Sequence, residues 1–147
     1  MRLIAHRGNF QGINKEQENS PEYLIEAIRN GYDVEVDTWV VDNVFYFGHD
    51  EPQYIISVKD FYSIIDHAWF HCKNIDALKY FISHMPTARY FWHQEDDYTL
   101  TSNNYIWTYP EKNISKQSII VHLEKPTQEY LDNFNGYGIC SDYVGHI

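Results

Sequence analysis

Short apolar runs of strand length recur along the whole chain, with polar residues and turn formers between them. Several runs are rich in β-branched and aromatic residues, which favour strands over helices. A short apolar run bounded by turn formers is typical of a buried strand. We therefore expect eight strands, at Leu3–Ala5, Val34–Val41, Val44–Phe47, Ala68–Phe70, Tyr90–Trp92, Tyr105–Tyr109, Ser118–Val121 and Tyr137–Cys140.

Four segments between these runs carry apolar residues at helical spacing. Each begins near a residue whose side-chain oxygen can cap a helix N-terminus. The expected helices start at Ser20-Pro21, Ser57, Asn74 and Pro126-Thr127. Gly31 and Gly136 are expected to follow the first and the last of them. From His93 to Ser118 the sequence shows no helical pattern.

Strands and helices alternate along most of the chain, and this order predicts an α/β fold built from parallel βαβ units. The 147 residues contain no low-complexity stretch and no Gly/Ser linker, so we expect one domain over residues 1–147. A full eight-stranded α/β barrel takes about 250 residues and is rarely shorter than about 200. Length therefore limits how complete such a barrel can be.

Acidic residues outnumber basic ones, with 21 Asp and Glu against 11 Lys and Arg and a formal charge of −10. This balance argues against binding to nucleic acid or to anionic membranes, because both need a basic patch. No apolar run approaches the ~20 residues of a membrane span. His6 and Arg7 come too early for a signal-peptide core. The two cysteines, Cys72 and Cys140, fit reduced and buried thiols, so we expect a cytoplasmic protein.

Nearly every expected strand ends in an ionisable or metal-ligating residue. These residues are His6 and Arg7, Glu35 and Asp37, His71 and Lys73, His93, His122 and Glu124, and Asp142. In parallel α/β folds, ligands bind outside the carboxyl ends of the strands, where such side chains would meet. For any single residue, the alternative is a loop that starts with a polar residue. Glu35 and Asp37 favour a site more strongly, because they interrupt an apolar run.

Glu35 and Asp37 are two residues apart in an expected strand, so their side chains would share one face. Unpaired carboxylates at this separation repel each other, which favours protonation of one of them. A hard divalent cation such as Mg²⁺ or Ca²⁺ removes this conflict, and carboxylate oxygens are its usual ligands. The alternative is an exposed edge strand with alternating polar residues. Spacing alone leaves both interpretations open.

Two histidines stand beside glycines directly after apolar runs, in His6-Arg7-Gly8 and in Gly48-His49-Asp50. Imidazole transfers protons near neutral pH, and a guanidinium offers phosphate a planar fork of donors. Glycine allows the chain to turn tightly. Two histidines around one metal-bound anion would form a general acid/base pair.

Four motifs follow one another within residues 3–50. They are Ile4-Ala5-His6-Arg7-Gly8, Glu18-Asn19-Ser20-Pro21-Glu22, Val34-Glu35-Val36-Asp37 and Gly48-His49-Asp50. In order and spacing they resemble the N-terminal half of glycerophosphodiester phosphodiesterases, members of the phosphatidylinositol-specific phospholipase C-like phosphodiesterase superfamily. The segment from Gly138 to Tyr143 is similar to the last strand of that family, and Trp107-Thr108 is similar to its penultimate strand. Residues 51–104 show little likeness.

The resemblance implies a TIM-type (β/α) barrel that cleaves a phosphodiester with the help of a divalent metal (Mg²⁺, Ca²⁺ or Mn²⁺). Its implied residues are His6 and His49 as the acid/base pair, Arg7, Asn19 and Lys73 as phosphate-binding residues, Glu35 and Asp37 as metal ligands, and Glu18, Trp107 and Asp142 as supporting residues. In glycerophosphodiesters, a neighbouring hydroxyl attacks phosphorus, and water then opens the cyclic intermediate. The metal and Arg7 would stabilise charge on the phosphate oxygens.

Two features depart from the family pattern. The family's Glu-x-Lys on the third strand reads His71-Cys72-Lys73 here, so His71 stands where a third metal ligand is expected. Imidazole suits Mn²⁺ or Zn²⁺ better than Ca²⁺. Three interpretations stay open: the metal preference has shifted, the ion is held by the two carboxylates and water, or the usual activity is lost. The chain is also about 100 residues shorter than a full barrel. We therefore expect a trimmed TIM-type barrel of about seven or eight strands, with helices missing in its second half.

The leading hypothesis is a metal-dependent hydrolase that acts on a glycerophosphodiester-like or sugar-phosphodiester small molecule. One alternative is a phospholipase-type lyase, which also uses two histidines and a metal–carboxylate pair. Another is a non-catalytic module of the same fold that binds phosphate esters. Missing helices would leave apolar surface uncovered, which favours a homodimer or another partner.

Overall fold

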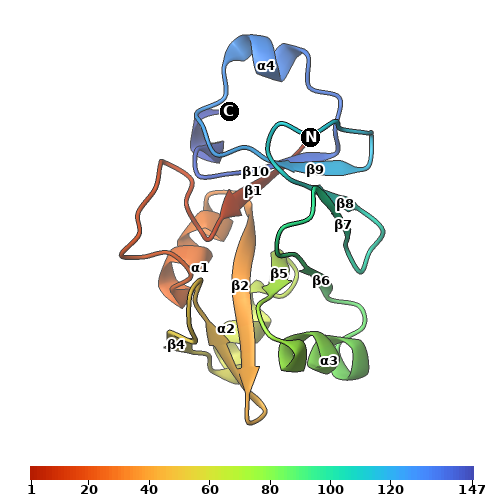
Figure 1. Cartoon of the computed structure of the whole chain (residues 1–147). Coiled ribbons are helices and arrows are strands. Elements are labelled where there is room, and N and C mark those ends of the chain that lie inside the picture. Colours follow the sequence, from red (N-terminus) through yellow and green to blue (C-terminus); the bar gives the residue numbers. More distant parts are fainter.

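A computed structural model describes all 147 residues (Figure 1). The strands are β1 (Arg2–His6), β2 (Asp33–Val41), β3 (Val44–Phe47), β4 (Tyr54–Ile55), β5 (Ala68–Cys72), β6 (Arg89–Trp92), β7 (Tyr98–Leu100), β8 (Ile106–Thr108), β9 (Ser118–Val121) and β10 (Gly138–Ser141). The helices are α1 (Pro21–Arg29), α2 (Val58–Ile64), α3 (Ile75–His84) and α4 (Gln128–Asp132), and a 3₁₀ turn covers Val144–His146. None of these helices has the length and the apolar character that crossing a membrane requires.

All ten strands belong to one curled sheet (Figure 1). Seven of them pair in parallel, in the order β6-β5-β2-β1-β10-β9-β8. The other three are antiparallel arms, with β3 on β2, β4 on β3, and β7 on β8. The long strand β2 joins the parallel strands to the arm formed by β3 and β4. Along one edge of β2, its first residues pair with β1 and its last residues pair with β3, while β5 pairs along the other edge.

The expectation of a TIM-type (β/α) barrel is wrong. The sheet is mixed and curls into a half-barrel, and no strand ladder joins β6 to β7 or β8 to close it. The four helices are short and do not alternate with the strands, since β6, β7, β8 and β9 follow one another without a helix. A βαβ unit takes about 30 residues or more. The segment between Trp92 and Ser118 is too short for the repeats that closure needs, and it forms an antiparallel arm instead.

The eight strands expected from apolar runs are confirmed, each within two residues of its expected bounds. Two further strands, β4 and β7, lie outside those expectations. Neither has the buried apolar face that marks a strand in a sequence: Ile55 in β4 is 68% exposed, and Leu100 in β7 is 66% exposed. Both are short edge arms that depend on pairing with a neighbouring strand.

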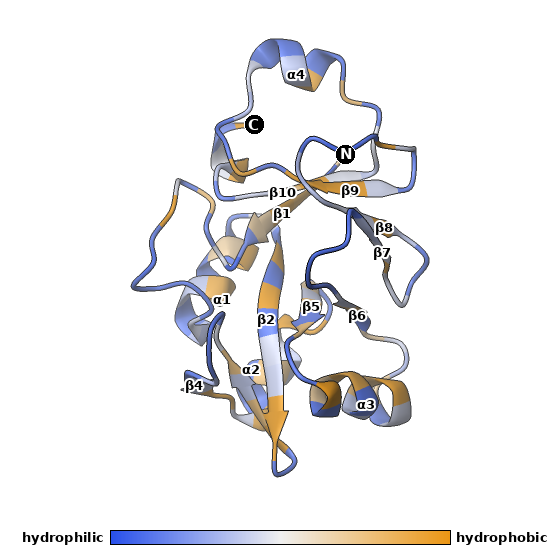
Figure 2. Cartoon of the chain, viewed as in Figure 1, coloured by the Kyte–Doolittle hydropathy of each residue, from blue (hydrophilic) through white to orange (hydrophobic).

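The four expected helices are also confirmed, and each has its expected cap. Backbone N–H groups of the first turn donate to the side chains of Ser20, Ser57, Asn74 and Thr127. Buried side chains of α2 and α3 pack on the outer side of the sheet, where Phe70 stacks on Phe61 and packs beside Phe81. Figure 2 shows hydrophobic and hydrophilic bands alternating along α3, as this one-sided packing requires. In contrast, α4 buries none of its residues.

The inner face of the half-barrel is built in layers. Its apolar layer takes one residue from each of six strands, namely Ile4, Trp69, Phe91, Trp107, Ile119 and Cys140. Positions two residues further along a strand face the same side. The next layer towards the carboxyl ends consists of His6, His71, His93, Tyr109, Val121 and Asp142. The alternation of the strands therefore gathers ionisable side chains above an apolar layer, and this arrangement positions the candidate site.

The opposite end of the inner face holds a buried network around Asp33, which is 3% exposed. Its carboxylate accepts hydrogen bonds from Arg89 Nη1 at 2.8 Å and from Trp69 Nε1 at 3.0 Å. Arg2 Nε and His67 Nδ1 lie 3.6 and 3.3 Å from the same carboxylate. The guanidinium of Arg89 also lies 4.7 Å from the centre of the Trp69 ring. This network closes the amino-terminal end of the inner face.

Candidate metal and phosphate site

A cavity of about 370 Å³ opens at the carboxyl ends of the parallel strands. Seven of the eleven residues that the family resemblance singles out line it, namely His6, Arg7, Glu35, His49, His71, Lys73 and Trp107. The other four, Glu18, Asn19, Asp37 and Asp142, lie directly behind this lining and hydrogen-bond to it or to one another. The fold thus brings together residues from both ends of the chain.

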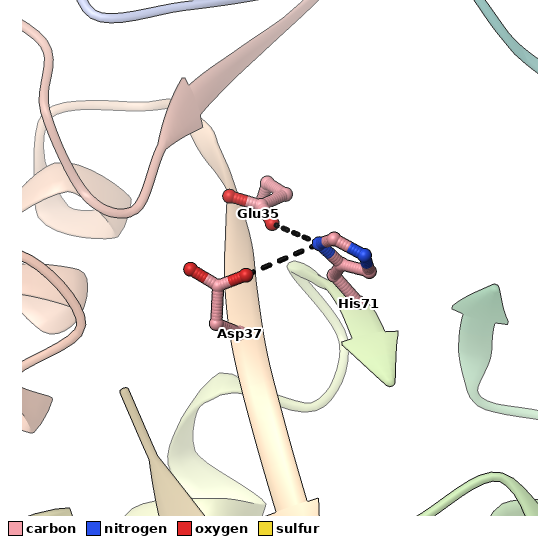
Figure 3. A group of neighbouring side chains, drawn as sticks. All are labelled: Glu35, Asp37 and His71. Carbon is pink, nitrogen blue, oxygen red and sulfur yellow. Dashed lines mark ion pairs between the residues drawn. The ribbon is translucent and has the colours of Figure 1, made fainter. Parts of the chain in front are cut away.

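Glu35, Asp37 and His71 direct one ligand atom each towards a common point (Figure 3). His71 Nδ1 lies 3.5 Å from Glu35 Oε1 and 3.1 Å from Asp37 Oδ1. All three ligand atoms lie within 4.8 Å of one another. The arrangement follows from the sheet, because Asp37 of β2 is the register partner of His71 of β5, and Glu35 shares the face of Asp37.

The second oxygen of each carboxylate is held by the protein. The backbone N–H of Arg7 donates to Glu35 Oε2 at 3.1 Å. Asn19 Nδ2 donates to Asp37 Oδ2 at 3.0 Å, and Asn19 Oδ1 accepts the backbone N–H of Asp37 at 3.0 Å. Because these bonds fix the outer oxygens, Glu35 Oε1 and Asp37 Oδ1 stay directed at His71.

Asp37 Oδ1 is a buried oxygen that makes no hydrogen bond. The nearest cationic atoms are His71 Nδ1 at 3.1 Å and Lys73 Nζ at 3.7 Å, while the Asp37 side chain is 1% exposed. Burial alone would raise the pKa of Asp37, but the contacts with His49, His71 and Arg7 outweigh it and hold this pKa well below its ordinary value. The site therefore contains an ionised carboxylate with one oxygen unsatisfied.

His71 is oriented from its far side. Its Nε2 lies 2.8 Å from the carbonyl oxygen of His93 and must carry a proton, because a carbonyl only accepts. The ring stacks on Phe91 with centroids 5.0 Å apart and planes 9° from parallel. Burial disfavours the imidazolium, but the close carboxylates of Asp37 and Glu35 outweigh it and raise the pKa of His71 to about 9. Nδ1 is thus the nitrogen available to the carboxylates or to a cation.

These residues fit a divalent cation. Two carboxylate oxygens and one imidazole nitrogen converge, one of the oxygens is buried and unsatisfied, and the remaining atom of each ligand is hydrogen-bonded to the protein. Such supporting bonds are typical of metal ligands, because they fix the tautomer and the orientation of each group. Binding of a cation would displace the proton from Nδ1 of His71.

His6 is held by two buried polar residues behind it. His6 Nδ1 donates to Asp142 Oδ1 at 2.9 Å, and Asn9 Nδ2 donates to the same oxygen at 2.8 Å. This leaves His6 Nε2 on the cavity side, 4.0 Å from Glu35 Oε2. Burial lowers the pKa of His6, but the bond to Asp142 and the charge of Glu35 outweigh it and raise the pKa overall. His6 is therefore suited to hold and release a proton.

His49 is held by a carboxylate on one ring nitrogen and by an arginine on the other. Its Nδ1 lies 3.1 Å from Asp37 Oδ2, and its Nε2 lies 3.2 Å from Arg7 Nη2. An arginine only donates hydrogen bonds, so His49 Nε2 accepts and its proton sits on Nδ1. Gly48 makes this placement feasible, since a Cβ there would collide with the carbonyl oxygen of Glu51. The lone pair of His49 Nε2 thus lies at the cavity wall, where it accepts the N–H of Arg7 Nη2.

Arg7 lies between the two histidines and the carboxylates. Its Nη1 donates to Glu18 Oε2 at 3.2 Å, and its Nε lies 3.2 Å from Asp37 Oδ2. The backbone of Arg7 is left-handed (φ 53°), and this turn aims its N–H at Glu35. A guanidinium has five N–H donors, so Nη1 and Nη2 each keep one for a ligand.

Three further predicted residues have different surroundings. Lys73 lines the cavity and lies near Asp37, while Trp107 is 4% exposed and stacks on Phe91. Asn19 does not line the cavity, because Asp37 takes up both ends of its side-chain amide. The amide of Asn19 therefore supports Asp37.

Some residues of the site were not among those predicted. Asn9 is fully buried and bridges Glu18 and Asp142. Its position directly after His6-Arg7-Gly8 could have indicated from the sequence that Asn9 belongs to the site. Gln94 and Tyr109 line the cavity beside His93, and Tyr109 could have been found as the inward position two residues after Trp107. His122 does not line the cavity; its ring stacks on Tyr130.

Comparisons with known proteins identify no relative of this chain. No protein-family model, curated protein or solved structure matches the chain. The interpretation of the site consequently depends on its own geometry and on the motifs that build it.

Proposed function

We propose that this chain is a metal-dependent phosphodiesterase that cleaves small phosphodiesters. The observation that carries the proposal is one cavity in which Arg7 and two oriented imidazoles meet a Glu–Asp–His cluster. The motifs within residues 3–50 resemble those of glycerophosphodiester phosphodiesterases, and the same motifs supply His6, Arg7, Glu35 and His49 of this lining. Residue chemistry and motif order therefore support the same class of reaction.

Charge neutralisation comes first in this proposal. A divalent cation on Glu35, Asp37 and His71 would neutralise the phosphate oxygens and make phosphorus more electrophilic. Arg7 would donate its remaining Nη N–H groups to the same phosphate, and Lys73 adds a second positive charge at the cavity wall. These local charges offset the formal charge of −10, which otherwise repels an anionic substrate.

The two histidines would divide the proton transfers. Once the N–H of Arg7 Nη2 turns from His49 to the phosphate, His49 Nε2 takes the proton of the attacking hydroxyl, and Asp37 stabilises the imidazolium that results. His6 Nε2 gives a proton to the leaving oxygen as the bond from phosphorus to that oxygen breaks. With a neighbouring hydroxyl as nucleophile, the first product is a cyclic phosphodiester, which water opens with the two roles reversed.

The far half of the cavity would hold the arm of the substrate beyond the phosphate. Its lining includes Trp107, Tyr109, Val121 and Leu123 and has no Asp or Glu. Tyr109 and Leu123 are each 47% exposed, so apolar surface lies open beside the phosphate-binding half. We infer that this half favours an uncharged arm with a carbon or ring face.

Turnover of glycerophosphocholine and bis(p-nitrophenyl) phosphate with Mg²⁺, Mn²⁺, Ca²⁺ or Zn²⁺ tests the proposal. His6→Ala and His49→Ala are expected to lower kcat by roughly 100-fold or more. His84→Ala changes an exposed histidine on α3 and is expected to keep full activity. Equal turnover by the wild type and both site variants would overturn the proposal. A cyclic phosphate as final product would favour a lyase, and phosphate-ester binding without turnover would favour a non-catalytic module.

A further inference from the structure

The Glu35–Asp37–His71 triad differs from an all-oxygen cation site in its donor atoms. Two of its ligand atoms are carboxylate oxygens, and the third is an imidazole nitrogen. Ca²⁺ takes six to eight oxygen ligands and Mg²⁺ favours oxygen and water, whereas imidazole suits first-row transition ions. The nitrogen donor therefore changes which ions the triad holds well.

The nitrogen of His71 cannot easily turn away from the triad. The His93 carbonyl accepts the N–H of Nε2 at 2.8 Å, and the ring lies flat against Phe91. A flip of the ring would break this hydrogen bond, and a smaller rotation would also break the stacking contact. Nδ1 thus remains directed at Glu35 Oε1 and Asp37 Oδ1, 3.5 and 3.1 Å away.

The carboxylates are equally constrained. Each keeps one oxygen in a hydrogen bond to the protein, from the Arg7 backbone to Glu35 and from Asn19 to Asp37. Only one oxygen of each faces the triad, and Asp37 Oδ1 is buried without a hydrogen bond. Three protein ligand atoms are too few to complete the oxygen shell of Ca²⁺, but they suffice for an ion that takes its other ligands from water or substrate.

We propose that this triad selects first-row transition dications, from Mn²⁺ to Zn²⁺, over Mg²⁺ and Ca²⁺. The proposal concerns the same site as the proposed phosphodiesterase function and rests on it for its biological meaning. The selectivity itself is a property of the ligand atoms and can be measured without any substrate.

The test is metal binding to the intact chain by calorimetry and by electron paramagnetic resonance of Mn²⁺. Wild-type protein is expected to bind Mn²⁺ at least about tenfold more tightly than Mg²⁺ or Ca²⁺. His71→Glu replaces the nitrogen with a carboxylate and should reduce this preference by roughly tenfold. Pulsed measurements should detect coupling of bound Mn²⁺ to a ring nitrogen in the wild type and lose it in His71→Gln.

The controls separate this proposal from the proposed function. His67→Gln changes a histidine of the Asp33 network and should leave Mn²⁺ affinity and the nitrogen coupling unchanged. Circular dichroism checks that each variant is folded. Equal affinity for Mn²⁺ and Ca²⁺, absence of metal binding, or Mn²⁺ binding without nitrogen coupling would each overturn the selectivity. Selective Mn²⁺ binding without phosphodiester cleavage would overturn the function and leave the selectivity intact.

Discussion

The imidazole of His6 and the carboxylate of Asp142, 136 positions apart in the chain, form a hydrogen bond of 2.9 Å. They meet because β1 and β10 pair in parallel, with Ala5 beside Ser141 in the ladder. The first and the last strand of the described chain therefore jointly orient one histidine of the candidate site.

Asp142→Asn is expected to destabilise the protein by roughly 2 kcal/mol at about pH 5.5, because it removes a buried charge-assisted hydrogen bond. Contacts with His6 outweigh burial and lower the pKa of Asp142, so this contribution is lost as the pH falls through that lowered pKa. The pKa of His6 is raised, so its contribution is complete below the ordinary value of 6.5 and is lost as the pH rises through the raised pKa.

The pair should therefore stabilise the fold most between the ordinary pKa of aspartate, 3.8, and that of histidine, 6.5. Urea denaturation of the wild type and Asp142→Asn at about pH 5.5 and about pH 9 measures this difference. A smaller loss of unfolding free energy is expected at the higher pH. The same loss at both pH values would show that the His6–Asp142 charge pair does not contribute.

Asp33→Ala is expected to lower the free energy of unfolding by about 3 kcal/mol or more. The buried carboxylate accepts from Arg89 Nη1 and Trp69 Nε1, and its removal leaves these two N–H groups without their acceptor at the closed end of the inner face. Urea denaturation measures the effect. Asp132→Ala on the exposed helix α4 is the matched control and should change stability by under about 0.5 kcal/mol. Similar values for both variants would contradict the structural role of Asp33.

Both cysteines should be unreactive in the folded protein. Cys72 and Cys140 are buried, and burial raises the pKa of Cys72 from 9.0 to about 12 and raises that of Cys140 as well. For Cys72 this lowers the thiolate fraction at about pH 8 by about a thousandfold, and thiolate is the reacting species. Ellman's reagent should detect almost no thiol in the native protein and both thiols in guanidinium chloride. Rapid reaction of the native protein would show that one thiol is accessible.

Asn19→Gly should weaken Mn²⁺ binding by roughly 10- to 100-fold, because it removes the two hydrogen bonds that orient Asp37. Glycine keeps the left-handed backbone of this residue (φ 63°) without strain, so the effect reports on the side chain. Asn104→Gly is the matched control, since Asn104 is exposed and has a similar φ of 67°. Calorimetry compares the two variants, and equal affinities would contradict a supporting role for Asn19.

Tyr109→Ala tests the proposed contact with the substrate arm. Loss of the ring should raise KM for an aryl phosphodiester by about fivefold with little change in kcat, because the proposed contact is with the arm and not with the reacting phosphorus. Tyr62→Ala removes an exposed tyrosine on α2 and should leave both constants unchanged. A fall in kcat at constant KM would instead place Tyr109 in the chemical step.

Much of the local structure could be predicted from the sequence, because it depends on neighbouring residues. Apolar runs located eight strands, and capping residues located the four helix starts. The spacing of Glu35 and Asp37 was enough to place them on one face, since side chains alternate along any strand. Closure of the sheet could not be obtained in this way. The motif resemblance suggested a TIM-type barrel, but the half-barrel has no strand ladder across its open side.

Most of the contacts that orient the candidate site join residues far apart in the chain. Pairing of β2 with β5 sets His71 beside Asp37, and pairing of β1 with β10 sets Asp142 beside His6. A sequence reveals that a strand ends in a histidine or an aspartate, but it does not specify which strand becomes its neighbour. The order of strands depends on how the whole chain buries its apolar faces. Local spacing therefore determines which residues can act, and strand pairing determines which of them act together.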